Sequence, residues 1–314
     1  MNIVYFKRTC KNNHVSYDAI KEFEDSLINI DIKKSASSFV EKCTAAISYK
    51  FPQIKFCFHR KKKTFSILMG SCDFYSFILE YKTYKYNAIY LFDAWPYSHN
   101  EIIYFCNILN IQYIFCSSYD ATQILKDKLP KKTSIIWIPE AIRADEYLYF
   151  NPQEKSIDVV QFGRKYDAIQ DKLCSELKKN SINYLYEKDK GHLLFETRQS
   201  FIEGLAKSKI SICFPRSITH PEVAKGQETM TIRYLQSMAS KTLVVGRIPQ
   251  EMKKLFSYNP VIELNLESPG EHIKDILTNY NDYIPLIENN YNEVITNHQW
   301  SNRWELISNI INNI

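Results

Sequence analysis

A polar segment ahead of an apolar run carries residue types that could bind a phosphate group. Residues 228–246 read ETMTIRYLQSMASKTLVVG and place Thr229, Thr231 and Arg233 at the start of a predicted helix. Either threonine could cap that helix, and its free first-turn N–H groups, together with the guanidinium fork of Arg233, would suit a diphosphate. Glu228 lies just upstream, where it could accept hydrogen bonds from sugar hydroxyls or act as a helix-capping acid.

The predicted helix has two unlike sides. Ile232, Leu235 and Met238 follow helical spacing and should face the core, whereas Arg233 and Gln236 are neighbours at i and i+3 on the opposite side. We expect this opposite side to face solvent, which would leave its polar side chains free to reach a ligand.

Three further basic positions follow predicted strands in the second half of the chain. The segments are Gly163-Arg164-Lys165, Pro215-Arg216-Ser217 and Gly246-Arg247. Sites in open parallel sheets form outside the carboxyl ends of the strands. Arginines at three strand ends therefore suggest an anion.

A histidine lies between these segments and the predicted helix. His220 belongs to FPRSITHPEVAKGQE. A histidine there could be a general base or a sugar ligand, or a loop residue with satisfied hydrogen bonds.

A loop in the first half contains an acid, an indole and an imidazole. LFDAWPYSHNE follows a predicted strand and includes Asp93, Trp95 and His99. The carboxylate could take a proton from an acceptor hydroxyl, and the indole could stack on a sugar ring. The alternative is a loop acid beside a packed indole.

Short apolar runs alternate with helical patterns along most of the chain, which is typical of parallel α/β construction. The runs are IKFCFH, FSILMG, AIYLF, YIFCSS and SIIWIPE in the first half, and SIDVVQFGR, INYLYEK, ISICFPR, TLVVG and VIELNL in the second. A polar stretch with an Asn151-Pro152 turn signal separates the two series. With 314 residues, two domains are expected.

The composition is that of a globular chain. Hydrophobic residues make up 45% and charged residues 24%, which argues against a disordered chain. The net charge of +5 is compatible with an anionic ligand but too small to indicate nucleic acid. The basic run HRKKK at residues 59–63 is expected in a solvated hairpin or loop, with membrane or acceptor docking as the alternative.

The cysteine pattern and the absence of targeting signals indicate a cytoplasmic protein. The eight cysteines lack paired metal spacing and read as buried thiols in a reducing compartment. No signal peptide and no apolar stretch of about 18 residues is present. Peripheral contact with the inner face of a membrane stays open.

The segment around Glu228 resembles the donor-binding segment of GT-B glycosyltransferases, especially the retaining group 1 class (family 4) and its spore-maturation-type relatives. That class carries a glutamate followed eight residues later by a second one, which is the glutamate of the motif L-E-A-M-A-x-G-x-P-V-V. Glu228 matches the first, and Gln236 stands at the position of the second. Lys241 replaces the usual glycine and Leu243 the usual proline. The resemblance implies that Glu228 contacts the donor sugar and that Gln236, with Arg216 nearby, serves the sugar or ribose.

Other segments extend the resemblance over most of the second half. VVQFGRKYD is similar to the family's V-G-R strand end, which implies that Arg164 and Lys165 hold the donor diphosphate. WIPEAIRADEY resembles the segment that closes the first domain, and NHQWSNRWELI the closing helix that crosses back to it. The implied fold class is α/β, GT-B, with two Rossmann-like doubly wound domains facing a cleft. Residues 1–145 would bind the acceptor, 146–297 the nucleotide sugar, and 298–314 would form the crossing helix.

The implied activity is transfer of a sugar from a nucleotide diphosphate donor to a glycan or lipid-linked glycan, as in bacterial surface polysaccharide synthesis. Glu228, His220 and Asp93 are the catalytic candidates. Bacterial fucosyltransferases, which share the fold but invert, are similar over TIRYLQSMASKTLVVGRIP. A nucleotide-sugar 2-epimerase and a non-catalytic binding module are further alternatives. No D-x-D, H-E-x-x-H, P-loop or G-x-G-x-x-G signature is present, so no metal and no cofactor is expected.

Overall fold

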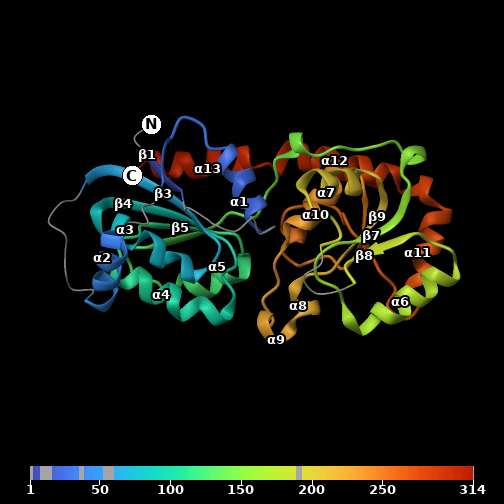
Figure 1. The fold of residues 1–314 in the computed structure, drawn as a ribbon, viewed down its shortest axis with the longest axis horizontal. Coiled ribbons are helices and arrows are strands. Elements are labelled where there is room, and N and C mark those ends of the chain that lie inside the picture. The colour runs from blue at the N-terminus through green and yellow to red at the C-terminus, as the bar shows by residue number, and fades with distance from the viewer. Residues whose placement is uncertain (1–2, 8–15, 35–38, 52–59, 189–192, 314) are drawn as a thin grey trace. The chain divides into compact units, whose positions relative to one another are not determined.

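The computed structural model describes all residues except 1–2, 8–15, 35–38, 52–59, 189–192 and 314 (Figure 1). The chain divides into two compact units. The first comprises Met1–Pro139 and Ser301–Ile314, and the second Glu140–Trp300. The binding roles that the sequence assigns to 1–145, 146–297 and 298–314 stay predictions.

The first unit is a parallel sheet with helices on both faces (Figure 1). The strand order is β2-β1-β3-β4-β5-β6. The strands are β1 (Ile3–Lys7), β2 (Asp31–Lys34), β3 (Arg60–Leu68), β4 (Tyr84–Leu91), β5 (Tyr113–Cys116) and β6 (Ser134–Trp137). The helices are α1 (Ser16–Asp25), α2 (Phe39–Lys50), α3 (Ile78–Thr83), α4 (His99–Ile108), α5 (Tyr119–Lys126) and most of α13 (Trp300–Asn312), with the 3₁₀ turns η1 (Ser71–Phe77) and η2 (Pro96–Ser98).

Alternate residues of β4 enter opposite cores, as the pleat of a strand buried on both faces requires. Ile89 and Leu91 belong to the cluster that includes Ile102 of α4. The ring of Tyr90 points the other way and meets Phe23 of α1 at 5.0 Å between centroids.

The last helix carries a buried apolar stripe, and its Trp304 ring lies 5.2 Å from that of Phe65 in β3. Trp300, Trp304, Ile307 and Ile311 are at most 3% exposed, which confirms the apolar stripe predicted for this segment. Lys63 Nζ donates to the carbonyls of Ile311 (2.8 Å) and Asn312 (2.9 Å), so a cation binds the carboxyl end of α13.

Two expectations, about the basic run and the cysteines, are wrong. The basic run does not form a loop from residue 60 on, because Arg60–Leu68 is strand β3 and pairs with β1 and β4; His59 lies outside the described residues. The cysteines are not uniformly buried, because Cys43 and Cys72 are exposed whereas Cys106, Cys116 and Cys213 are buried. The run IKFCFH lies outside the described residues.

The second unit is another parallel sheet, with strand order β11-β10-β9-β7-β8. Its strands are β7 (Ile157–Gln161), β8 (Tyr184–Tyr186), β9 (Ser208–Cys213), β10 (Leu243–Gly246) and β11 (Ile262–Glu263). Its helices are α6 (Asp167–Lys179), α7 (Arg198–Ala206), α8 (Arg216–Thr219), α9 (Pro221–Ala224), α10 (Ile232–Ala239), α11 (Pro269–Thr278) and α12 (Ile284–Asn297), with 3₁₀ turns at η3 (Ala144–Glu146), η4 (Pro152–Glu154), η5 (Met252–Lys254) and η6 (Tyr280–Tyr283).

Both faces of the second sheet are covered by helices (Figure 1). Val160 packs in a cluster with Leu235 of α10, whereas Val159 packs in a cluster with Leu173 of α6. The α/β architecture with two Rossmann-like doubly wound domains is therefore present.

Candidate functional site

The topology of the second sheet marks one place for a ligand. From β7 the chain adds β8 on one side and then crosses to add β9 on the other, so the strand order reverses between β7 and β9. Ligands of open parallel sheets bind outside the carboxyl ends of the strands at such a switch point. Phe162 and Phe214 are the residues that directly follow these two strands.

Arg233 reaches this switch point from the first turn of α10. Its Nη1 donates to the carbonyl oxygen of Phe162 (2.9 Å), and its Nη2 to that of Phe214 (3.4 Å). The side chain is only 8% exposed. One guanidinium thus joins the ends of β7 and β9.

The expectation that the polar side of this helix faces solvent is wrong. Arg233, Gln236, Ser237 and Ser240 are all buried. Ser237 Oγ donates to Ser211 Oγ of β9 at 2.9 Å, so the helix lays its polar side on polar groups of the sheet. Buried polar groups need such partners, and this pairing supplies one for Ser237.

Gly163 lets the backbone after β7 lie close to the guanidinium of Arg233. It adopts φ 76°, a left-handed conformation that favours glycine. A Cβ at this position would lie 3.2 Å from Arg233 Nη1. The turn after β7 therefore depends on a residue without a side chain.

A carboxylate caps α10 in place of the expected threonine. Thr231 occupies the N-cap position, but its side chain makes no capping hydrogen bond. The N–H of Ile232 instead donates to Glu140 Oε2 at 2.9 Å, across 92 residues of sequence. Thr229 also does not cap the helix, since its hydroxyl donates to Glu251 Oε2. Glu140 places a negative charge at this helix start, where it interacts favourably with the helix dipole.

Glu228 is held by two groups. Its Oε2 accepts the backbone N–H of Gln250 at 2.8 Å, and its Oε1 accepts the hydroxyl of Ser217 at 3.3 Å. Ser217 follows β9, and Gln250 follows β10. The half-buried carboxylate of Glu228 is thus fixed beside the carboxyl edge of the sheet.

Three predicted site residues influence one tyrosine. Burial raises the pKa of Tyr234 well above its ordinary value, and Cys213 and Glu228 raise it further, whereas the positive charges of Arg233 and Arg164 lower it. The Tyr234 hydroxyl donates to Arg247 O at 2.7 Å. Arg164, Glu228 and Arg233 therefore share one electrostatic neighbourhood.

The remaining predicted donor residues make other contacts. Lys165 Nζ donates to Lys188 O (3.0 Å) and lies over the Tyr186 ring. Gln236 Nε2 donates to the hydroxyl of Tyr147 (2.9 Å) and is buried.

Two more predicted residues lie in the segment of short helices that follows β9, where His220 separates α8 from α9. Arg216 is the first residue of α8. A ring nitrogen of His220 lies 3.1 Å from Thr219 Oγ1. The ligand roles of these residues stay predictions.

In the first unit, Asp93 and Trp95 bond each other after β4, and His99 contacts the backbone of the residue between them. Trp95 Nε1 donates to Asp93 Oδ1 at 2.9 Å, and the indole is 2% exposed. His99 Nε2 lies 3.1 Å from Ala94 O, and burial lowers the pKa of His99. A neutral imidazole that donates from Nε2 fits this geometry. Asp93 is exposed at φ 47°, in the left-handed region that aspartate adopts more readily than most residues other than glycine.

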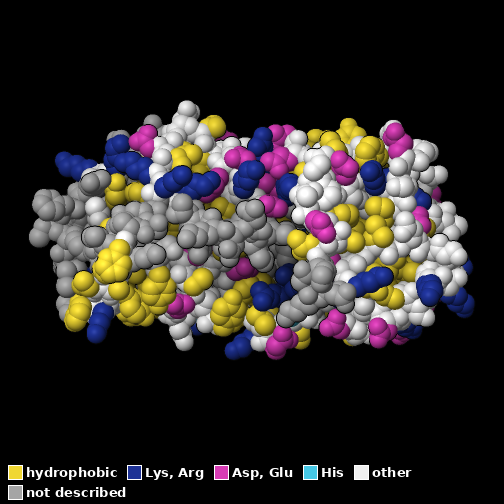
Figure 2. Space-filling model, viewed as in Figure 1, with side chains coloured by type: hydrophobic (Ala, Val, Ile, Leu, Met, Phe, Trp, Pro, Cys, Tyr) yellow, Lys and Arg dark blue, Asp and Glu magenta, His cyan; other side chains and the backbone are white. Residues whose placement is uncertain are grey.

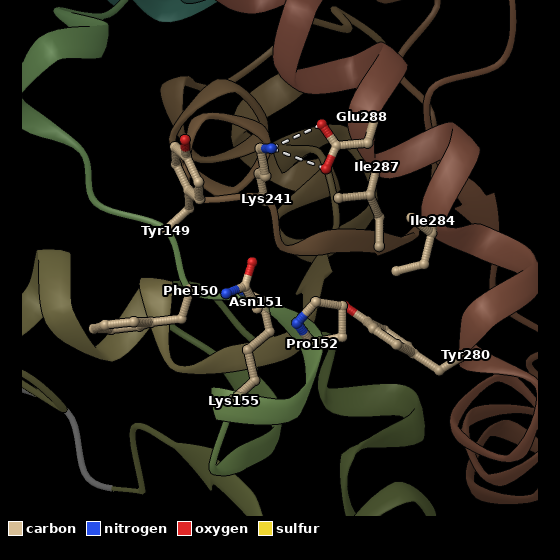
Figure 3. A pocket seen from close by; sticks show the side chains of 10 residues that line it. All are labelled: Tyr149, Phe150, Asn151, Pro152, Lys155, Lys241, Tyr280, Ile284, Ile287 and Glu288. Atoms are coloured by element: carbon tan, nitrogen blue, oxygen red, sulfur yellow. Dashed lines mark hydrogen bonds and ion pairs between the residues drawn. The ribbon is translucent and has the colours of Figure 1, made fainter.

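A small pocket with a volume of about 50 Å³ lies at the opposite, amino-terminal edge of the second sheet. Its lining residues are Tyr149, Phe150, Asn151, Pro152, Lys155, Lys241, Tyr280, Ile284, Ile287 and Glu288 (Figure 3). Lys241 Nζ bonds both carboxylate oxygens of Glu288 (2.9 and 2.7 Å). Lys155 Nζ donates to carbonyls of Ala206, Ser208 and Ser240 (2.8, 2.9 and 3.3 Å). The ammonium groups of Lys155 and Lys241 thus have hydrogen-bond partners within the second unit, at the edge of the sheet away from the switch point.

Surface and cluster properties add little to this picture. On the face drawn in Figure 2, basic and acidic side chains are interspersed over the second unit. Within the described ranges, no group of three or more His, Cys, Asp or Glu side chains could hold a metal ion. Among the same residues, no helix is long and apolar enough to cross a membrane.

No family model and no curated protein sequence matches this chain. Several solved structures have a similar fold. HepE from Anabaena, in complex with UDP and glucose, aligns over 99% of both chains with a TM-score of 0.62 and 8% identity. Sucrose-phosphate synthase from Thermosynechococcus elongatus covers 99% of this chain and 98% of its own, with a TM-score of 0.60 and 8% identity.

A third similar structure is that of a TarM variant from S. aureus in complex with fondaparinux, α-GlcNAc-glycerol and UDP. It matches 79% of this chain with a TM-score of 0.54 and 13% identity, and this chain spans 55% of TarM. The full-length matches to HepE and sucrose-phosphate synthase confirm the predicted GT-B fold class.

Proposed function

We propose that this chain is a glycosyltransferase that moves a sugar from a nucleotide diphosphate donor to a glycan or lipid-linked glycan acceptor. The observation that carries the proposal is the position of Arg233, whose guanidinium lies at the β7/β9 switch point of a GT-B fold. The HepE structures with UDP and with UDP-glucose support the same donor class.

The donor diphosphate binds at the carboxyl edge of the second sheet. Arg233 uses two N–H groups for the carbonyls of Phe162 and Phe214, and a guanidinium has five. Its other donors, with Arg164 and the left-handed turn at Gly163, bind the diphosphate. Positive side chains and backbone N–H groups neutralise the leaving group, so the reaction proceeds without a metal ion.

The donor sugar binds beside Glu228. The Gln250 N–H and the Ser217 hydroxyl fix the carboxylate, so it is preorganised to stabilise positive charge that develops at the anomeric carbon. Asp93 and His220 are the candidate bases toward the acceptor hydroxyl, and Trp95 and His99 shape the acceptor loop. The acceptor class is a surface polysaccharide precursor, made on the cytoplasmic side of a membrane that the enzyme contacts peripherally.

A turnover screen across nucleotide sugars tests the proposal. Purified protein is incubated with each donor and with an acceptor panel, and release of nucleoside diphosphate and of glycosylated product is measured. Acceptor-dependent release with one donor is the expected result. Free epimerised sugar without acceptor would instead indicate a 2-epimerase, and binding without turnover would indicate a non-catalytic module. The anomeric configuration of the product, read by NMR, distinguishes a retaining from an inverting enzyme.

A further inference from the structure

A second carboxylate, which sequence patterns did not single out, lies next to the donor segment. Glu251 directly precedes the turn η5 and is 2% exposed. Its Oε2 accepts the hydroxyl of Thr229 at 2.8 Å and the backbone N–H of Met230 at 2.5 Å. A carboxylate this deeply buried requires such bonds, and both come from the two residues that follow Glu228.

Residues 228–230 and residues 250–251 are therefore joined by two carboxylates, one from each segment, and each accepts hydrogen bonds from the other segment. Glu251 binds residues 229–230, while the N–H of Gln250, its chain neighbour, binds Glu228. The distance between the segments sets where the Glu228 carboxylate lies. Glu251 fixes that distance, because its side chain spans the gap.

We propose that Glu251 is a positioning residue that sets the Glu228 carboxylate at the donor sugar; this inference rests on the proposed glycosyl transfer. It acts through the length of its side chain, as a hydrogen-bond acceptor at a defined distance. The nucleoside diphosphate contacts Arg233 and not the hydrogen bonds that Glu251 and Gln250 make to residues 228–230. A change at Glu251 therefore affects the rate of sugar transfer and leaves diphosphate binding intact.

Two substitutions separate length from charge. Glu251→Asp keeps the charge but withdraws the acceptor by about 1.5 Å, one carbon–carbon bond. Glu251→Gln keeps the length and one acceptor oxygen, which can accept both bonds. Glu288→Asp is the matched control, because it shortens a glutamate at the opposite edge of the sheet that bonds Lys241.

The readouts are kcat and KM with the intact nucleotide sugar, and the Kd of the nucleoside diphosphate by calorimetry. Glu251→Asp is expected to lower kcat by about 10- to 100-fold, as a displacement of about 1 Å does, with Kd within about twofold of wild type. Glu251→Gln should recover most of the rate, and Glu288→Asp should match wild type.

Three results would overturn the inference: wild-type kcat in Glu251→Asp, a rate loss matched by loss of diphosphate affinity, or Glu251→Gln as slow as Glu251→Asp. If Glu251→Asp does not fold, Thr229→Val takes its place, because it removes one of the two hydrogen bonds to Glu251. A wild-type kcat in Thr229→Val would equally contradict the inference. A wild-type protein that neither binds nor turns over any nucleotide sugar contradicts the proposed function itself, and this inference with it.

Discussion

The role of Arg233 can be tested by a substitution that removes its charge and keeps its bulk. Arg233→Met replaces the guanidinium with an apolar side chain that still fills the space beside Gly163. Loss of a charge-assisted hydrogen bond costs about 1.5–3 kcal/mol, which corresponds to a roughly 10- to 150-fold higher Kd for the nucleoside diphosphate. The carbonyl of Phe162 also loses its 2.9 Å partner, so the melting temperature should fall.

The assay is isothermal titration with UDP as the first probe, since UDP is bound in the HepE and TarM structures. The matched control is Arg247→Met, at the end of β10. The Arg247 side chain is 57% exposed and pairs with Glu263, and such surface pairs contribute about 0–1 kcal/mol. Arg247→Met should therefore bind the diphosphate nearly as tightly as wild type.

One outcome refutes the reasoning directly. If folded Arg233→Met binds the diphosphate as tightly as wild type, the anion site lies elsewhere and the switch-point argument fails. If Arg233→Met does not fold, Arg233→Lys carries the test. It keeps the charge but loses the planar fork, so its affinity should fall between those of wild type and a charge-free variant.

Four further predictions concern the donor sugar, metals, pH and the last helix. Glu228→Gln should lower kcat/KM with the intact donor and leave the Kd of the bare diphosphate within about twofold; equal losses in both would place Glu228 on the diphosphate. Turnover should persist in excess EDTA, and activity that is lost and then restored by Mg²⁺ or Mn²⁺ would contradict metal independence. Burial and, to a smaller extent, the charge of Lys241 lower the pKa of Lys155 from 10.5 to about 7. Between these two pH values Lys155 binds a proton in the unfolded chain but not in the folded one. The free energy of unfolding should therefore rise with pH over this range. Melting curves of wild type and Lys155→Met at pH 7 and 9 check this, and equal pH slopes would refute it. Trp304→Ala should lower the free energy of unfolding, measured in urea, by about 3–5 kcal/mol, because the indole is buried. If the urea midpoint is unchanged in Trp304→Ala, or after deletion of residues 298–314, the last helix does not contribute to stability.

Local patterns predicted the elements of the second unit well. The apolar spacing of Ile232, Leu235 and Met238 predicted α10, and the run TLVVG predicted β10. These signals are strong because buried strands and amphipathic helices need contiguous or periodic apolar residues. The strands β1 and β2 were not predicted.

The sequence could not show which partners the polar residues would have. Helical spacing places Arg233 opposite the apolar side but does not reveal that the strand-end carbonyls of Phe162 and Phe214 lie there. Glu140 caps α10 from 92 residues away, and Glu251 binds Met230 from 21 residues away. Such contacts depend on the strand order, which one sequence does not specify.

Thermal denaturation with a panel of nucleoside diphosphates tests the central claim most directly. A ligand at 100 times its Kd raises the free energy of unfolding by about 2.7 kcal/mol, which is a readily measured shift in melting temperature. The account predicts that one nucleoside diphosphate stabilises the wild-type protein, that the matching nucleoside without phosphates stabilises it less, and that Arg233→Met loses most of the shift. If no nucleoside diphosphate at millimolar concentration changes the melting temperature, a donor diphosphate site at the carboxyl ends of β7 and β9 is contradicted.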